Sequence, residues 1–451
     1  MRSIRAGFVG FGEVNTPKEV ILSLCQSAAN RLKEQDWDIV YAEPVSDDEA
    51  YEEADRAVQQ LQGHEFDLLV VCVAGWIPTH AVIRVTDRFR HLPMLLWGLT
   101  GWMEEGRLVT TAPQAGTSAL RPVMAGLGYR FRYVYSTVDQ PYPEDKIDAF
   151  GRAARAASLL REARIGSMGY RDMLLYGTPV DILSLRREIG IEVECFEMLE
   201  IVRGLDLVDE NEVQETLRYC LDNWTFAKQP DQETLVRGIK YYLVLKQKIE
   251  KRKYQAVSLI DVDGMKKLEG FPPAMVFMLI ADLLDVCTTP ENDIVGNTTQ
   301  LMVRYLTGQT AHYMEFYEYF ADRVLIGVPD YVPSDVVRGD VTLLPAKFGS
   351  FTGSLLNVSK VKDGPVTLMR LVEDRGRYSM HMAFGQAVQP RSWEEYGWEQ
   401  PAPQLPSLEV ILEEPVESFV DKIMSQHTII AYGDIRAEMK QLCSLLNIPL
   451  L

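Results

Sequence analysis

The sequence has few of the features that stabilise secreted proteins or insert proteins into membranes. Its six cysteines are scattered over 451 residues, and none forms a C-x-x-C pair. We therefore expect reduced thiols in a cytoplasmic protein, with neither a disulfide framework nor a zinc–cysteine site. No stretch approaches the roughly 18 consecutive apolar residues that a membrane-spanning helix needs, so we expect no membrane partner.

Basic residues are also scarce. Lysine and arginine total 46 against 64 aspartates and glutamates, which gives a formal net charge of −18. Nucleic acids and anionic membranes are bound through basic surfaces, so neither is expected as a partner. Apolar residues, by contrast, make up 47% of the chain, a proportion typical of globular proteins. A chain of this length exceeds one ordinary hydrophobic core and should divide into several domains.

The N-terminal third alternates predicted strands with predicted helices. Apolar strand patterns at 4–12, 66–76 and 92–102 are separated by helical spacing, as in residues 18–35. Such alternation predicts a parallel sheet with helices on both faces. The glycines in the first strand and turn, "IRAGFVGFG", do not follow the order G-x-G-x-x-G, so a nicotinamide cofactor is not expected.

Two further regions complete the predicted organisation. Residues 163–340 again alternate strand and helix patterns, which predicts a second α/β domain. From residue 341 onward, short β-type runs are divided by Gly, Ser and Asp, a texture typical of an antiparallel barrel or sandwich. We therefore predict an α/β fold class: two N-terminal α/β domains with parallel sheets, 1–162 and 163–340, followed by a β-barrel-like C-terminal domain, 341–451, that ends in a strand–helix unit.

A pair of acids stands out in "TTPENDIVGN", directly after an apolar region. Glu291 follows the predicted strand 286–289, and ligands of α/β proteins gather at the carboxyl ends of such strands. The residues of this segment are also typical of a turn or of a helix start. Taken alone, Glu291 is more typical of such a turn than of a metal ligand.

A second acidic position lies in "TAHYMEFYEYFADRV". Read as a strand, the segment places Glu315 on one face with three tyrosines, where a partly desolvated carboxylate needs a partner such as a metal ion. Read as a helix, it places Glu315, Glu318 and Asp322 on a solvated stripe. The pattern by itself slightly favours the helix.

Histidines are few, six in all, and His427 is the one that begins an apolar strand pattern, in "MSQHTIIAYGD". By itself that setting is more typical of a core or capping histidine. Hard divalent cations prefer oxygen ligands, however, and one imidazole added to two carboxylates shifts the preference toward manganese or a similar metal.

Taken together, these residues resemble the L-fucose isomerase / L-arabinose isomerase superfamily over most of the chain. In the fucose-type enzymes a T-E-N-D segment carries a metal-binding glutamate, and a second acid lies 24 residues later. Here "PEND" places Glu291 and "YMEFYEYF" places Glu315 at the same interval. The late metal histidine of the arabinose type precedes a strand and a helix, as His427 does. Trp76, in "VCVAGW", matches an aromatic of the fucose type that reaches a neighbouring subunit's site.

The resemblance implies a metal-dependent aldose–ketose isomerase. Glu291 and Glu315 would be metal ligands and the acid/base pair, His427 the third metal ligand, and Trp76 a substrate-binding residue. The expected cofactor is a divalent metal, Mn²⁺ before others, and the expected partners are a monosaccharide and further copies of the chain, as a homohexamer. Proton transfer would run through an ene-diol or ene-diolate of the sugar.

Departures from the family pattern leave the substrate open. Glu315 stands where the fucose type has Asp, and the second metal histidine of the arabinose type has no counterpart. Fucose-like or D-arabinose-like sugars and sulfonated hexoses of the sulfoquinovose type remain candidate substrates. The alternative function is a non-catalytic sugar-binding or regulatory protein, because similar α/β layers serve both roles. A metal-dependent hydrolase is a third alternative.

Overall fold

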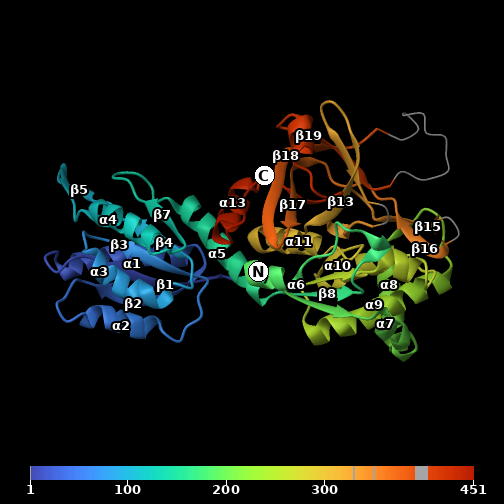
Figure 1. Ribbon diagram of the computed structural model, residues 1–451, viewed down its shortest axis with the longest axis horizontal. Helices are drawn as coiled ribbons and strands as arrows, with labels where there is room; N and C mark the ends of the chain where they lie inside the picture. Colours follow the sequence, from blue (N-terminus) through green and yellow to red (C-terminus); the bar gives the residue numbers. More distant parts are fainter. Residues whose placement is uncertain (1, 329–330, 349–350, 392–404) are drawn as a thin grey trace. The chain divides into compact units, whose positions relative to one another are not determined.

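A computed structural model describes residues 2–328, 331–348, 351–391 and 405–451 (Figure 1). The chain forms two compact units, Met1–Ser158 and Leu159–Leu451. The predicted division into three domains stays a prediction, since the second unit contains both a parallel sheet and a barrel. In the part of the chain that the structure describes, no helix combines the length and the apolar character needed to cross a bilayer.

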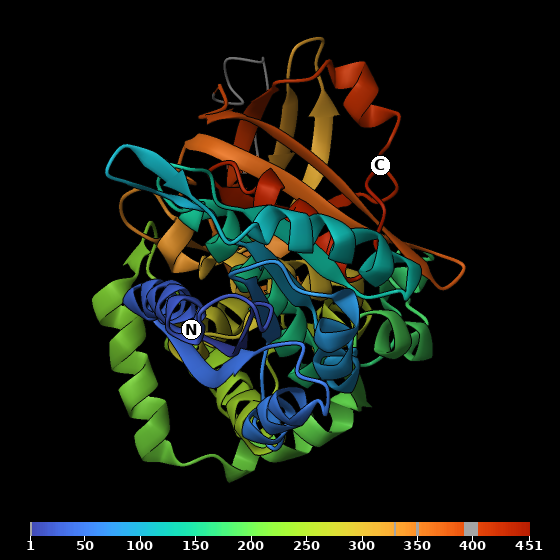
Figure 2. The same ribbon diagram turned by 90° about the vertical axis from the view of Figure 1, so that its left-hand side faces the viewer.

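The first unit is built on a five-stranded parallel sheet with the strand order β2-β1-β3-β4-β7. Its central strand β3 is buried at every position, which is typical of a parallel strand covered on both faces. Helices α2, α3 and α4 pack on one face, and α1 and α5 on the other (Figures 1 and 2). The elements are β1 Ile4–Phe11, α1 Lys18–Glu34, β2 Trp37–Val45, α2 Glu52–Leu61, β3 Leu68–Val73, α3 Thr79–Thr86, β4 Met94–Gly98, β5 Trp102–Glu104, β6 Arg107–Val109, α4 Pro113–Gly126, β7 Phe131–Tyr135 and α5 Glu144–Glu162.

The second unit begins with a four-stranded parallel sheet in the order β12-β11-β8-β9. Aspartates cap several of its helices: Asp209 accepts a hydrogen bond from the first turn of α8, and Asp181 does the same for α6. The elements are β8 Arg164–Met168, α6 Ile182–Glu188, β9 Glu192–Phe196, α7 Met198–Gly204, α8 Glu210–Asn223, α9 Gln232–Arg252, β11 Ala256–Leu259, α10 Ala274–Leu284, β12 Cys287–Thr289 and α11 Ile294–Thr307.

A closed antiparallel barrel completes the second unit, in the strand order β13-β14-β19-β18-β17-β20. Beside it lies a small sheet in the order β10-β15-β16. The barrel takes its first two strands from residues before 341, so the β-rich texture after that residue supplies only four of its six strands. The elements are β10 Thr225–Phe226, β13 His312–Tyr319, β14 Val324–Gly327, β15 Thr342–Phe348, β16 Phe351–Asn357, β17 Gly364–Asp374, β18 Arg377–Val388, β19 Ser407–Leu412, α12 Val416–Val420, β20 His427–Tyr432 and α13 Arg436–Leu445.

Helix α11 joins the sheet to the barrel inside the second unit. It contacts β8, β11 and β12 on one side and β13, β17 and β20 on the other, and nearly all of its residues are buried. A buried helix can have no charged face, and the sequence from 294 to 303 accordingly has none. The helix therefore brings the carboxyl end of β12 close to the first residues of β20.

The structure confirms the predicted fold class and decides the alternative left open at Glu315. Parallel sheets in the N-terminal part are followed by an antiparallel barrel. The helical interpretation of residues 310–324 is wrong, because β13 pairs with β14 on one side and with β20 on the other. Neighbouring strands on both edges supply hydrogen bonds to the backbone of this segment, and this pairing outweighs its weak helical periodicity.

Candidate metal centre

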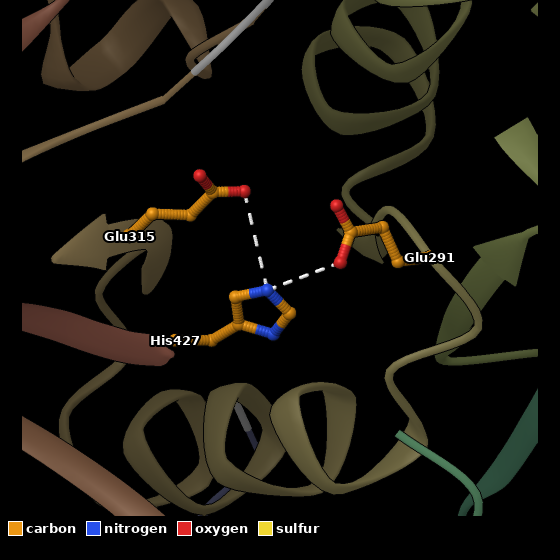
Figure 3. Close-up of side chains that lie close together, drawn as sticks. All are labelled: Glu291, Glu315 and His427. Atoms are coloured by element: carbon orange, nitrogen blue, oxygen red, sulfur yellow. Dashed lines mark ion pairs between the residues drawn. The ribbon is translucent and has the colours of Figure 1, made fainter. Parts of the chain in front are cut away.

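Three side chains from distant parts of the sequence converge in the second unit (Figure 3). Glu315 lies on β13 and His427 is the first residue of β20. The two are direct partners across this antiparallel pair, so their side chains leave the same face. Glu291 comes from the turn that follows β12, at the carboxyl end of the parallel sheet. One ligand atom from each residue lies within 4.8 Å of the other two.

The distances within this cluster suit a shared divalent cation. His427 Nε2 lies 3.1 Å from Glu291 Oε2 and 4.0 Å from Glu315 Oε1. Two atoms bonded to one cation at about 2.1 Å can be no more than about 4.2 Å apart, so both distances fit. The Nε2 atom is buried and has no hydrogen-bond partner among the residues that the structure describes. A buried ring nitrogen that faces two carboxylates provides, together with them, the donor set that such a cation requires.

Asp293 orients the imidazole. Its Oδ2 atom lies 2.8 Å from His427 Nδ1, so the ring presents Nε2 to the two glutamates. Burial would lower the pKa of His427, but the hydrogen bond with Asp293 and the nearby carboxylate of Glu291 raise it above the ordinary value. A carboxylate behind a metal-binding histidine is a common arrangement, because it fixes the tautomer and makes the ring a better ligand.

Arg370 holds Asp293 in place from strand β17. Its guanidinium makes two hydrogen bonds to the carboxylate, of 2.6 and 2.9 Å, and the backbone N–H of Gly296 donates a third of 2.8 Å. Burial alone would raise the pKa of Asp293, but Arg370 and His427 hold it well below the usual range. Asp293 is thus a fixed anion, with both partners of this ion pair shielded from solvent.

Sequence reasoning did not assign Asp293 and Arg370 to the site. Asp293 is the second acid of "PEND", and it caps α11 as helix-start chemistry predicts. This ordinary structural role explains the residue, so nothing in the sequence indicates its contact with His427. Arg370 lies in the middle of a β-type run, and no local pattern marks it. Residues 293 and 370 meet only because α11 packs against β17.

Trp76 belongs to the first of the two units. It follows β3 in the first unit, its side chain is partly exposed, and its backbone is fixed by hydrogen bonds with Glu13 and Thr111. Glu291, Glu315 and His427 all belong to the second unit. The predicted role of Trp76 in substrate binding therefore stays a prediction.

The C-terminal part of the chain is similar to a known protein family. Residues 342–451 match the family model described as L-fucose isomerase, C-terminal domain. This part of the chain is therefore similar to the L-fucose isomerases. The match confirms the predicted resemblance to the fucose-type enzymes for residues 342–451. The match includes Arg370 and His427, whereas Glu291 and Glu315 precede it.

Several curated L-fucose isomerases are similar to part of the chain. The enzyme of Streptococcus pneumoniae (strain Hungary19A-6) is 27% identical over 155 residues, which are 33% of this chain and 26% of the relative. The enzyme of Haemophilus influenzae (strain PittEE) is 31% identical over 144 residues, 30% of this chain and 24% of the relative. That of Bacteroides thetaiotaomicron is 28% identical over 146 residues, again 30% and 24%. The chain thus covers about a quarter of the length of these L-fucose isomerases.

Proposed function

We propose that this protein is a metal-dependent aldose–ketose isomerase that acts on a monosaccharide. The observation that carries the proposal is the convergence of Glu291, Glu315 and His427, in a relative of the L-fucose isomerases, from segments up to 136 residues apart in the sequence. Two carboxylates and an imidazole facing one point are both a metal-binding set and an acid/base pair.

The three residues would hold a divalent cation, with Mn²⁺ as the first candidate. Bound there, the cation supplies the Lewis acidity that stabilises negative charge on the sugar oxygens beside the reacting carbons. Asp293 and Arg370 keep the imidazole in the tautomer that leaves Nε2 free for this purpose.

The two glutamates would move the protons. Isomerisation transfers one proton between adjacent carbons and another between their oxygens. A carboxylate removes the proton from the carbon beside the carbonyl, which gives an ene-diol of the sugar, and returns it to the neighbouring carbon. The other carboxylate exchanges the proton between the two oxygens. Glu315 is the more exposed of the two side chains and Glu291 is almost buried, so their surroundings differ as the two tasks require.

The finer features of the proposal come from the family resemblance. L-Fucose-like, D-arabinose-like and 6-sulfonated sugars are the proposed substrates, and Trp76 is the proposed contact to the sugar. We further propose a cytoplasmic homohexamer in which Trp76 serves a neighbouring subunit. The names of the relatives, all L-fucose isomerases, support the sugar class.

Turnover of a sugar panel tests the proposal directly. L-Fucose, D-arabinose, L-arabinose, D-ribose and sulfonated glucose would be incubated with the full chain after loading with Mn²⁺, and ketose formation measured. We expect one or more sugars to be isomerised, activity to vanish on chelation and Mn²⁺ to restore it. In D₂O, deuterium should enter the carbon beside the carbonyl, as proton transfer requires.

The alternatives give different results in the same assay. A sugar-binding protein would bind a sugar with no ketose formed and with no need for metal. A hydrolase would release a smaller product, whereas an isomerase leaves the mass of the sugar unchanged. Either result would contradict the proposed reaction.

Metal binding is expected to weaken as the pH falls. The cation and a proton compete for Nε2 of His427, whose pKa in the metal-free protein lies above the ordinary value of about 6.5. The neutral ring that binds metal is fully present only above this raised pKa, so affinity should fall by up to roughly tenfold per unit below it. Calorimetric titration of the metal-free protein with Mn²⁺ between about pH 6 and 8 measures the effect. A flat affinity over this range would contradict the assignment of His427.

A further inference from the structure

We propose that Asn292 and Asp261 are positioning residues that hold the Glu291 carboxylate toward His427. The inference rests on the proposed function, because it concerns one of the proposed metal ligands. It assigns a role to two buried side chains that neither bind the metal nor take part in proton transfer.

The backbone at Glu291 is the first observation. Glu291 has φ of +61° and Asn292 has φ of +54°, so two successive residues other than glycine are left-handed. Asn tolerates this conformation well, whereas a long side chain such as Glu rarely adopts it. A conformation of this kind at a candidate site persists only when its surroundings impose it.

Asp261 holds the first residue of the turn. Its Oδ1 atom accepts a 2.7 Å hydrogen bond from the backbone N–H of Glu291. The Lys266 ammonium lies 3.1 Å from Oδ2, and both side chains are nearly buried. Asp261 and Lys266 are the ends of a π-helical turn, Asp261–Lys266, which begins just after β11. The charged acceptor is therefore anchored to the parallel sheet.

Asn292 holds the second residue of the turn. Its side-chain amide donates to Ser167 Oγ at 3.1 Å and to the carbonyl oxygen of Met168 at 2.8 Å, both at the end of β8. Its backbone N–H donates to the carbonyl oxygen of Leu259, at the end of β11. Asn292, which is 1% exposed, thus fastens the turn to two neighbouring strands.

Loss of these contacts would let the turn relax toward the right-handed region. That change rotates the direction in which Glu291 leaves the backbone, and its carboxylate would move away from Nε2 of His427, now 3.1 Å distant. The two clamps therefore contribute to metal binding through the placement of a ligand and not through contact with the metal.

Substitutions at Asn292 separate positioning from simple backbone strain. Asn292→Ala removes the amide, and Asn292→Gly removes the amide while easing the left-handed conformation. We expect both to weaken Mn²⁺ binding by about 10- to 100-fold, measured by calorimetry on the metal-free full chain. Asn447→Ala is the matched control, since Asn447 is also left-handed, with φ of +55°, but is exposed. Its Mn²⁺ affinity should equal that of the wild type.

Substitutions at Asp261 test the other clamp by conservative rescue. Asp261→Asn keeps an acceptor for the Glu291 N–H and should retain most of the Mn²⁺ affinity, whereas Asp261→Ala should lose about tenfold or more. Wild-type affinity in Asp261→Ala would remove Asp261 from the proposal. Wild-type affinity in Asn292→Gly would show that only backbone freedom matters and would overturn the role of Asn292.

A crystal structure of Asn292→Gly separates this inference from the proposed function. We expect the Glu291 carboxylate to leave its place beside His427 Nε2, whether or not metal is present. A carboxylate that stays in place overturns the inference even if the wild type binds Mn²⁺. Absence of Mn²⁺ binding in the wild type overturns the proposed function, and the displaced carboxylate would still support the positioning role.

Discussion

Replacing Glu291 with Gln is expected to lower turnover in the proposed isomerisation by roughly 10²- to 10⁴-fold, the contribution typical of a positioned acid/base group. The amide keeps the size of the side chain but can neither accept a proton from the substrate nor offer an anionic oxygen to a cation. The folded state should be preserved, because the backbone N–H of residue 291 would still reach Asp261. Turnover of the best sugar of the panel and calorimetric Mn²⁺ titration measure the two effects.

Glu318→Gln is the matched control for this substitution. Glu318 lies on the same strand as Glu315, but its side chain is exposed and it does not belong to the cluster. We expect turnover and Mn²⁺ affinity of this variant to match those of the wild type. Full turnover in Glu291→Gln would show that the carboxylate takes no part in the reaction and would remove the main support for the enzymatic proposal.

Replacing Arg370 with Met is expected to lower the free energy of unfolding by about 3–5 kcal/mol. The Asp293 carboxylate, which is 0% exposed, would lose both charge-assisted hydrogen bonds from Arg370 and keep only its contacts with His427 and the Gly296 N–H. A buried charge that has lost its partner is far more costly than a pair replaced together. Urea denaturation followed by far-UV circular dichroism gives the change in stability.

Two further variants make this prediction specific. Arg375→Met changes the same residue type in the neighbouring β17–β18 turn, where the side chain is exposed, and should alter stability by less than about 1 kcal/mol. Asp293→Asn combined with Arg370→Met removes the stranded charge, so the double variant should be more stable than Arg370→Met alone. A loss below about 1 kcal/mol in Arg370→Met would contradict the buried ion pair.

Local patterns in the sequence were sufficient for the fold class, whereas the three residues of the cluster were nominated together only through the resemblance to a known family. Strand and helix periodicities predicted the parallel sheets. Each strand or helix must bury an apolar face, so its apolar residues recur at the period of that element whichever elements pack against it. Glu291 could be nominated because carboxyl ends of strands collect ligands, and Glu315 and His427 because their spacing and context resemble a known family. The periodicities and the family motifs depend only on residues close together in the sequence or on known spacings, so they can be read without the tertiary structure.

Only the tertiary structure decided how these residues meet. Residues 310–324 have no decisive periodicity of their own, and pairing with β14 and β20 makes them a strand with Glu315 opposite His427. Arg370 and Asp293 find each other across 77 residues, and Asp261 and Asn292 fasten the turn at Glu291 to two strands. Each of these contacts depends on which backbone segments lie side by side. Packing and hydrogen bonding over the whole unit determine which segments become neighbours, so a short stretch of sequence does not predict it.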